Sequence, residues 1–341
     1  MSTSGQKLEL AAEYPPPDEQ IHIDSLIEQL RNKMGRDYAT SRTLRDAHPK
    51  MHGCVRAEFQ VEANLPPELG IGVFKAPRTF PAWVRFSNQN NKVAPDWDKD
   101  IRGVAIKLLG VDGEKLLEHE TQEQTQDFIL ISDNRFVTKD VAQFDGLVKG
   151  LTSGFLSLIW FFLTHLRVAR NLIVSLRRHA NPLEIQYFSV APYRLGAKAV
   201  KYTLRPSGAV KSALPEKPSD DYLREAMVRQ LASGSATFDF MVQFQTDPDT
   251  MPIEDPGIAW DEAVSPFRKV ATLTIGRQDF DSEKQREFGD NLSFNPWHCL
   301  PEHRPLGGIN RARRQVYAAL STFRHQRNAV VKREPTPDEM P

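Results

Sequence analysis

Residues 54–61 read Cys-Val-Arg-Ala-Glu-Phe-Gln-Val, and apolar and polar side chains alternate along this stretch. Because successive side chains of a strand point to opposite faces of a sheet, this period of two predicts a half-buried β-strand. Residues 82–87, Ala-Trp-Val-Arg-Phe-Ser, alternate in the same way. Residues 102–109 and 127–132 also predict strands, the second of them almost wholly apolar. We therefore expect the first third of the chain to form mainly sheet.

Further along the chain, helices and strands fall in blocks. Residues 141–178 and 220–232 have the apolar spacing of helices, and a last helix is expected from Gly307-Gly308 to about residue 326. Further strands are predicted at residues 185–190, 199–203, 237–245 and 270–275. This order lacks a regular βαβ rhythm, which favours an α+β fold with a mainly antiparallel sheet. Several strands are apolar on one face and polar with aromatics on the other, which indicates an antiparallel β-barrel core surrounded by helices.

The two ends of the chain differ from the middle in composition. Residues 1–40 predict a polar arm, with Pro15-Pro16-Pro17, followed by a short helix around residues 23–34. Residues 329–341, which include three prolines, predict a disordered tail. We expect the intervening residues 41–328 to form one domain.

Composition excludes several classes of protein. The 341 residues include 44 basic and 44 acidic side chains, and this balance argues against a nucleic-acid-binding protein. The two cysteines, Cys54 and Cys299, are too few for a disulfide scaffold and suit a reducing compartment. No targeting segment is recognisable near Met1, so we expect a cytoplasmic location.

The longest apolar run, residues 155–166, is interrupted by Ser157, Thr164 and His165. It is too short for a bilayer span, which needs about 20 residues. Arginines follow at positions 167, 170, 177 and 178. One interpretation is a core helix with a basic end. The other is peripheral contact of residues 155–178 with a membrane surface or a partner.

Four local clusters hold residues that could perform chemistry: Arg45-Asp-Ala-His48-Pro-Lys50, Trp83-Val-Arg85-Phe-Ser87, Asp100-Ile-Arg102-Gly103 and Arg313-Arg-Gln-Val-Tyr317. Taken singly, each has an ordinary explanation as a capping group, a solvated charge or a surface pair on a helix. His48 and His52 have the i, i+4 spacing of zinc ligands. However, Pro49 weakens a helix there and no third ligand follows, which disfavours a metal site.

In their order and spacing, these clusters resemble the haem catalase family. The distal signature of that family has an arginine three residues before the essential histidine and a lysine two residues after it, as in Arg45, His48 and Lys50. A V-R-F-S strand, a D-x-R-G segment and an apolar strand ending in aspartate follow. The proximal R-x-x-x-Y signature matches Arg313 and Tyr317. The chain is similar to the short, catalase-like branch (the catalase-related peroxidases), since it has no room for the additional C-terminal helices of full-length enzymes.

The resemblance implies that haem b is bound, with the Tyr317 phenolate as the iron ligand. A free phenol has a pKa of about 10, and Arg313 lies one helical turn earlier, where its guanidinium could donate to the phenolate and keep it ionised. His48 is implied as the general acid–base that moves the peroxide proton. Ser87 is implied as the hydrogen-bond partner that fixes the tautomer of the His48 ring.

Other residues are implied to surround the haem. Arg45, Arg85 and Arg102 would bind the two propionates. Phe136 would pack against the haem, although ordinary core packing explains it nearly as well. Gln124 takes the place of the family's distal asparagine, and its amide reaches further. This departure puts hydrogen-peroxide dismutation in doubt more than peroxide cleavage itself.

The resemblance thus implies an oxidoreductase that cleaves hydrogen peroxide or organic hydroperoxides through an oxyferryl intermediate. The apolar run at 155–166 favours a bulkier, lipid-like hydroperoxide. Two alternatives share the fold: a non-catalytic haem- or lipid-binding protein, and a hydroperoxide isomerase of the allene oxide synthase type. A haem-free structural barrel is a further alternative. We expect a homo-oligomer with no nucleic-acid partner.

Overall fold

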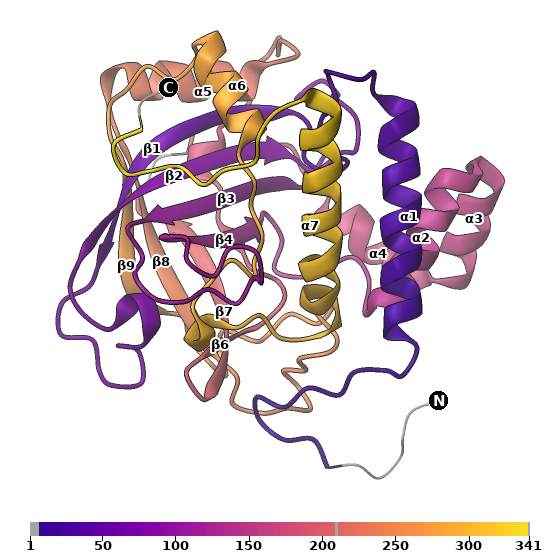
Figure 1. The fold of residues 1–341 in the computed structure, drawn as a ribbon, viewed down its shortest axis with the longest axis horizontal. Coiled ribbons are helices and arrows are strands. Elements are labelled where there is room, and N and C mark those ends of the chain that lie inside the picture. The colour runs from indigo at the N-terminus through magenta and orange to yellow at the C-terminus, as the bar shows by residue number, and fades with distance from the viewer. Residues whose placement is uncertain (1–6, 209–210, 340–341) are drawn as a thin grey trace.

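The computed structural model describes residues 7–208 and 211–339. Its centre is an antiparallel sheet in the order β5-β4-β3-β2-β1-β9-β8-β7-β6, and a further pairing of β5 with β7 closes eight of these strands into a barrel. The strands are β1 Met51–Val61, β2 Thr79–Asn88, β3 Arg102–Leu109, β4 Thr125–Ile131, β5 Tyr187–Phe188, β6 Tyr193–Leu195, β7 Lys198–Pro206, β8 Ala236–Phe244 and β9 Arg268–Ile275. The expected antiparallel β-barrel is confirmed (Figure 1).

The barrel interior is filled by the apolar side chains of the alternating strands. Phe59 of β1, Phe128 of β4 and Phe240 of β8 are almost completely buried and contact one another, with ring centroids 4.9 to 6.3 Å apart. Tyr202 of β7 adds a fourth ring to this cluster. Because a strand places every second side chain inside, the polar and small residues of the same strands must face outward.

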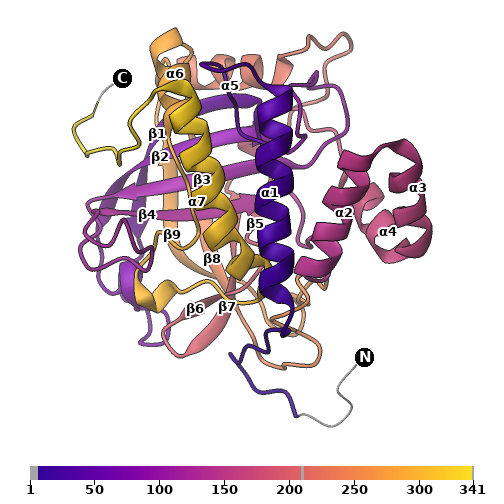
Figure 2. The ribbon, with the colours of Figure 1, turned by 45° about the vertical axis from the view of Figure 1, so that its right-hand side comes forward.

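Helices surround the barrel: α1 Glu19–Asp37, α2 Val141–Ser153, α3 Phe155–Thr164, α4 Leu166–Ser175, α5 Tyr222–Ser233, α6 Glu283–Asn291 and α7 Gly308–Asn328, with short 3₁₀ turns at Gly72–Phe74, Pro182–Glu184 and Pro301–His303. Helix α7 stands beside the outward face of β1–β4, with α1 alongside it (Figure 2). Apolar side chains such as Leu26 of α1, Val148 of α2 and Val316 of α7 form one cluster that joins these three helices.

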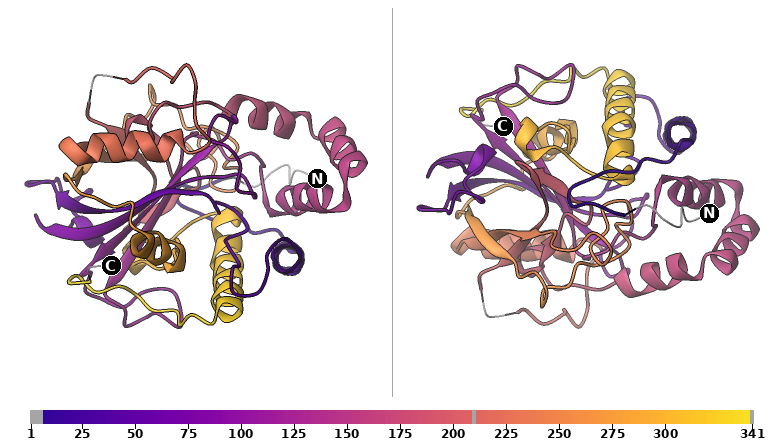
Figure 3. Two further views of the ribbon diagram at one scale, coloured as in Figure 1. Left: turned by 90° about the horizontal axis from the view of Figure 1, so that it is seen from above. Right: turned by 90° about the horizontal axis from the view of Figure 1, so that it is seen from below.

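Helices α2, α3 and α4 form a block that projects to one side of the barrel (Figure 3). Among the described residues, no single helix has the length and apolar character to cross a membrane. The pair α3 and α4, whose axes are bent by 105°, meets that test only when the two helices are taken together and by length and composition alone.

Part of the segment after α7, where the sequence predicts a disordered tail at residues 329–341, lies against the barrel. Its Glu334 side chain is only 5% exposed and lies against the outer face of the barrel, where it pairs with the fully buried Lys107 of β3 at 2.6 Å. A buried lysine requires counter-charges, and a segment far away in sequence supplies one of them. Composition alone could not reveal this pairing, because it depends on where β3 meets the end of the chain.

Candidate functional site

The outward face of β2, β3 and β4 carries a mixture of charged, small and apolar side chains. The strand register aligns them in two neighbouring rows: Arg85, Ala105 and Ile129, then Ser87, Gly103 and Ile131. Ala105 and Ile129 keep accessible surface although they lie in the middle of the sheet. Helix α7 stands beside this face, so side chains from the sheet and from α7 can meet here (Figures 1 and 2).

His48 reaches this face from the segment that precedes β1. Its Nδ1 atom lies 3.0 Å from the Oγ atom of Ser87. Its backbone has a φ of +63°, which is uncommon for a residue other than glycine, and Pro49 follows, before which an extended backbone is usual. Gly103 makes room for the ring, because a Cβ atom there would lie 2.4 Å from His48 Cε1. The predicted pairing of His48 and Ser87 is thus present, at a position with an uncommon backbone.

The surroundings of His48 keep its ring neutral. Burial first, and then the positive charges of Arg85 and Arg45, lower the pKa of His48 to about 3. Arg313 of α7 adds to this lowering, so its charge is close enough to act on the imidazole. An imidazole with such a pKa is unprotonated at neutral pH and can accept a proton from a ligand. The sheet face and the α7 face therefore belong to one electrostatic site.

Arg45 and Arg85, whose charges act on His48, lie close to a third arginine, Arg324, and all three are largely buried. Burial lowers the pKa of Arg45, and the charges of Arg85 and Arg324 lower it further. The carboxylate nearest to them is Asp290, which lies 3.7 Å from Arg45 and 3.5 Å from Arg85. No other carboxylate of the described residues pairs with these three arginines, and the Nε atom of Arg85 has no hydrogen-bond partner among them. Such an excess of buried positive charge fits a ligand with carboxylate groups.

Arg324 is a site residue that the sequence analysis did not identify. It lies seven residues after Tyr317 and eleven after Arg313, so the three side chains lie along one side of α7. Arg324 donates to the carbonyl oxygens of Asp290 and Leu292, the latter at 3.1 Å. The helical spacing was a usable signal, but an arginine in the last turns of a helix is ordinary until its partners are known.

The proximal pair of the expected site lies on α7. Arg313 is buried, donates to the Oδ1 atom of Asn310 at 3.1 Å and stacks 5.6 Å from the Phe136 ring centroid. Tyr317 is half-buried and packs against the apolar cluster of α1, α2 and α7. No hydrogen bond to its hydroxyl is found within the described part of the chain. The Arg313 guanidinium thus donates to Asn310, whereas the sequence predicted the Tyr317 hydroxyl as its partner.

Two predicted residues lie elsewhere. Arg102 is fully buried but donates to Asn88 and to the carbonyl oxygens of Asp96 and Asp98, in a network separate from the three arginines. Gln124 is exposed and precedes β4 at the opposite end of the β3–β4 pair from Gly103. Six residue steps separate the two ends, which corresponds to about 20 Å along the strands.

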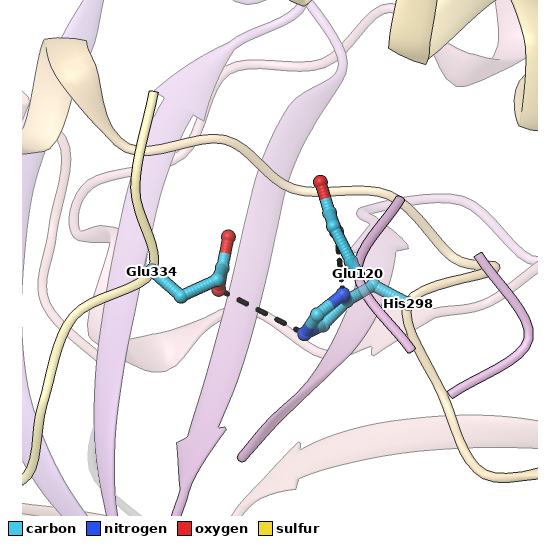
Figure 4. A group of neighbouring side chains, drawn as sticks. All are labelled: Glu120, His298 and Glu334. Carbon is cyan, nitrogen blue, oxygen red and sulfur yellow. Dashed lines mark ion pairs between the residues drawn. The ribbon is translucent and has the colours of Figure 1, made fainter. Parts of the chain in front are cut away.

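Two groups of side chains contain residue types that can ligate a metal. His52 lies apart from His48, since its Nε2 atom contacts the Oδ1 atom of Asn88 at 2.6 Å. Glu120, His298 and Glu334 bring their ligand atoms within 4.8 Å of one another (Figure 4). However, Lys332 pairs with Glu120 and Lys107 with Glu334, so lysines already neutralise these carboxylates. The second group therefore functions as an ion-pair network that holds the end of the chain.

No protein-family model matches the chain, and no curated protein matches it. Solved structures of catalases do match it. The fold is similar to that of a fungal catalase, with a TM-score of 0.66, 16% identity and coverage of 94% of this chain and 66% of that chain. A bacterial catalase matches with a TM-score of 0.66 and 15% identity, and the match covers 98% of this chain and 67% of that chain. Catalase A from Saccharomyces cerevisiae matches with a TM-score of 0.65 and 17% identity, and the match covers 94% of this chain and 70% of that chain.

The chain thus spans about two thirds of the length of these catalases. At 15 to 17% identity, the similarity establishes a catalase-like α+β fold. Fold alone does not define chemistry, so a function has to be argued from the side chains at the site.

Proposed function

We propose that this protein binds haem b between the outward face of β2–β4 and α7, and that it cleaves hydroperoxides there. The observation that carries the proposal is the gathering of Arg45, Arg85 and Arg324, the first two of which act on His48, with Asp290 as their nearest carboxylate. These arginines come from three segments that are far apart in sequence. The catalase-like fold of the chain supports the same proposal at a coarser level.

The chemistry of the residues fits haem. A haem has a flat apolar ring with two carboxylates at one edge. The three arginines offer donors for both carboxylates, and the unpartnered Nε atom of Arg85 is one of them. Ala105 and Ile129 offer small and apolar accessible surface next to these charges. The half-buried Tyr317 on the facing helix would supply the phenolate ligand, one helical turn after Arg313.

When bound by a tyrosinate, ferric haem supplies the iron that polarises and splits a peroxide bond. The chain supplies the proton transfers. In our proposal, Nδ1–H of His48 donates to Ser87, which leaves a lone pair on Nε2. Nε2 then accepts the proton of the bound hydroperoxide and returns it to the oxygen that leaves. The lowered pKa of His48 serves this role, since the ring stays unprotonated before the substrate arrives.

The residues around His48 favour an organic hydroperoxide over hydrogen peroxide. Ile131 pairs with Gly103 directly beside the imidazole, and Ile129 is the next outward residue of β4. The predicted amide of Gln124 lies at the far end of the same strands. An apolar distal surface favours an alkyl or acyl chain, whereas dismutation of hydrogen peroxide benefits from polar groups that orient a small substrate. We therefore propose a peroxidase that acts on organic hydroperoxides, including those of lipids.

The proposal is tested with the protein expressed with added haemin. We expect a Soret band from wild-type protein, and its loss or a large shift in Tyr317→Phe. His48→Ala should keep the Soret band and lose at least 100-fold in the rate of hydroperoxide cleavage, the range expected when a general acid–base is removed. Wild-type protein without a Soret band would overturn the haem proposal.

Product analysis separates the remaining alternatives. Reduction of a fatty-acid hydroperoxide to the alcohol at the expense of a donor supports the peroxidase. Conversion without a donor to an allene oxide identifies an isomerase and contradicts the peroxidase. If haem is bound and His48→Ala leaves residual activity unchanged, the protein is a binder without turnover.

A further inference from the structure

Helix α3 exposes one apolar face that no described part of the chain covers. Large side chains at positions 155, 156, 160 and 163 are 63 to 80% exposed. At 100° per residue these positions lie on one side of the helix. Leu166, the first residue of α4, follows the bend between the two helices and is 71% exposed. We call Phe155, Leu156, Trp160, Leu163 and Leu166 the α3–α4 apolar face. Contiguous apolar surface of this kind marks an interaction site.

The opposite side of α3 already packs closely against the protein. A Cβ atom on Gly146 of α2 would lie 3.1 Å from the Phe161 ring, and one on Gly150 would lie 3.5 Å from Leu158. The two glycines therefore let α2 and α3 approach each other through Phe161 and Leu158. Because this contact anchors α3, the apolar face on its other side is not needed to hold the helix. Its position on the projecting helical block leaves it accessible (Figure 3).

The segment that carries this face has more basic than acidic side chains. Residues 146–183 contain five lysines and arginines and no aspartate or glutamate, in a chain whose 44 acidic and 44 basic residues balance. Lys149 and Arg167 pair with Asp145 and Asp255, respectively, at 2.7 Å. The remaining three arginines of the segment, at positions 170, 177 and 178, make no ion pair with any described residue. The surface is therefore both apolar and positively charged.

On α4 these two properties occur on the same side of the helix. Leu166, Arg170 and Ile173 are spaced by four and three residues, so their side chains follow one another along one side of α4. All three are exposed. Arginines interleaved with apolar groups match the boundary of a bilayer, where acyl chains and anionic head groups lie within one side chain's reach. Trp160 adds the amphipathic ring that is enriched at this depth.

We propose that the α3–α4 apolar face docks the protein on the surface of a membrane that contains anionic lipids. A second copy of the chain fits less well, because a twofold contact would bring the unpaired arginines of both copies together. The apolar face would enter the head-group region, and Arg170 would bind a lipid phosphate. This proposal is independent of haem binding, although it would bring the proposed site close to lipid hydroperoxides.

The proposal is tested by co-sedimentation of the full chain with vesicles. We expect binding to phosphatidylcholine vesicles that contain about 30% phosphatidylglycerol, weaker binding to phosphatidylcholine alone, and weakening by salt. Arg170→Gln should reduce the affinity for the anionic vesicles by about fivefold. The triple variant Leu156→Ser, Trp160→Ser, Leu163→Ser should lose binding. The matched control, Val264→Ser with Val331→Ser, removes exposed apolar groups elsewhere and should bind as wild type.

Equal vesicle binding by the triple variant and by wild-type protein would overturn the proposal. Wild-type protein that binds neither kind of vesicle would overturn it too. If the triple variant instead dissociates a wild-type dimer in size-exclusion chromatography while vesicles have no effect, the face binds a second copy and the membrane proposal fails. Tyr317→Phe should bind vesicles as wild type does, so failure of the haem proposal leaves this result unchanged. Near-wild-type circular dichroism of each variant shows that its fold is retained.

Discussion

A Cβ atom on Gly103 would lie 2.4 Å from Cε1 and 2.6 Å from Nδ1 of His48, so these two residues are in close contact across the sheet face. His48 can occupy its position beside Ser87 only because residue 103 has no side chain. The contact gives Gly103 a role in positioning the ring, and that role can be tested directly.

Gly103→Ala should keep the fold and displace the His48 ring. We expect hydroperoxide cleavage to fall about 100-fold, the order of loss that follows a misplacement of about 1 Å. Stopped-flow kinetics with an organic hydroperoxide measures this rate. Gly276→Ala is the matched control, since a Cβ atom there meets no atom within 4 Å, and it should behave as wild type. Unchanged kinetics in Gly103→Ala would show that the position of the ring does not matter for the reaction.

Arg324→Met tests the arginine group. Removing one of three guanidiniums should weaken haem binding by about tenfold or more, because a hydrogen bond to a charged group is lost. The measurement is a titration of apoprotein with haemin, followed at the Soret band. Arg333→Met is the control, since Arg333 is exposed and pairs only with Glu339 in the described chain. Equal affinities of the two variants would remove Arg324 from the proposed site.

The pH dependence of the reaction follows from the pKa of His48. Since burial and neighbouring positive charges lower this pKa to about 3, the ring is unprotonated at any higher pH. The rate of hydroperoxide cleavage should therefore be flat between about pH 5 and pH 8, with no inflection near the usual histidine value of about 6.5. A pH–rate profile on wild-type protein measures it. A step near 6.5 that disappears in His48→Gln would contradict the assignment.

Glu334→Gln tests whether the end of the chain is held by its ion pair. The substitution keeps the shape of the side chain but leaves Lys107 with Asp127 as its remaining close carboxylate, at 2.7 Å. We expect a loss of about 1–3 kcal/mol in the free energy of unfolding, because Lys107 loses one of its two charged hydrogen-bond partners. Urea unfolding measures it. Glu339→Gln lies in the same segment and pairs with the exposed Arg333, so its effect should stay below about 0.5 kcal/mol.

A low pH should weaken the ion-pair network that includes Glu120, His298 and Glu334. Burial alone would raise the pKa of Glu120, but its hydrogen bond and ion pair with His298, together with the charge of Lys332, lower it to about 2. A carboxylate with a lowered folded-state pKa stabilises the protein above its unfolded value of about 4.5, and this stability is lost as the pH falls towards 2. Unfolding followed between about pH 5 and pH 2 should therefore be less steeply pH-dependent in Glu120→Gln than in wild type. An identical pH dependence of unfolding in the two proteins would show that the ion pairs of Glu120 do not contribute to stability.

The alternation of residues 54–61 and 82–87 was sufficient to predict the barrel strands, because side-chain period is a local property of the backbone. The pairing of His48 with Ser87, and the helical spacing of Arg313 and Tyr317, could also be predicted, since short motifs carry both. Arg102 was placed with the wrong partners by motif alone. Its side chain follows the interior side of β3 to Asn88, a direction that only the strand register defines.

The sequence by itself determined which segments form strands and helices, and it supplied the histidine, tyrosine and arginine types that the site needs, because these depend on local patterns along the chain. Only the tertiary structure decided that Arg324 joins Arg45 and Arg85, that Gln124 lies at the far end of its strand pair, and that Glu334 pairs with Lys107. These relationships join residues that are far apart in the sequence. They depend on barrel closure and on the packing of α7, since buried charges must find their partners wherever the fold brings them.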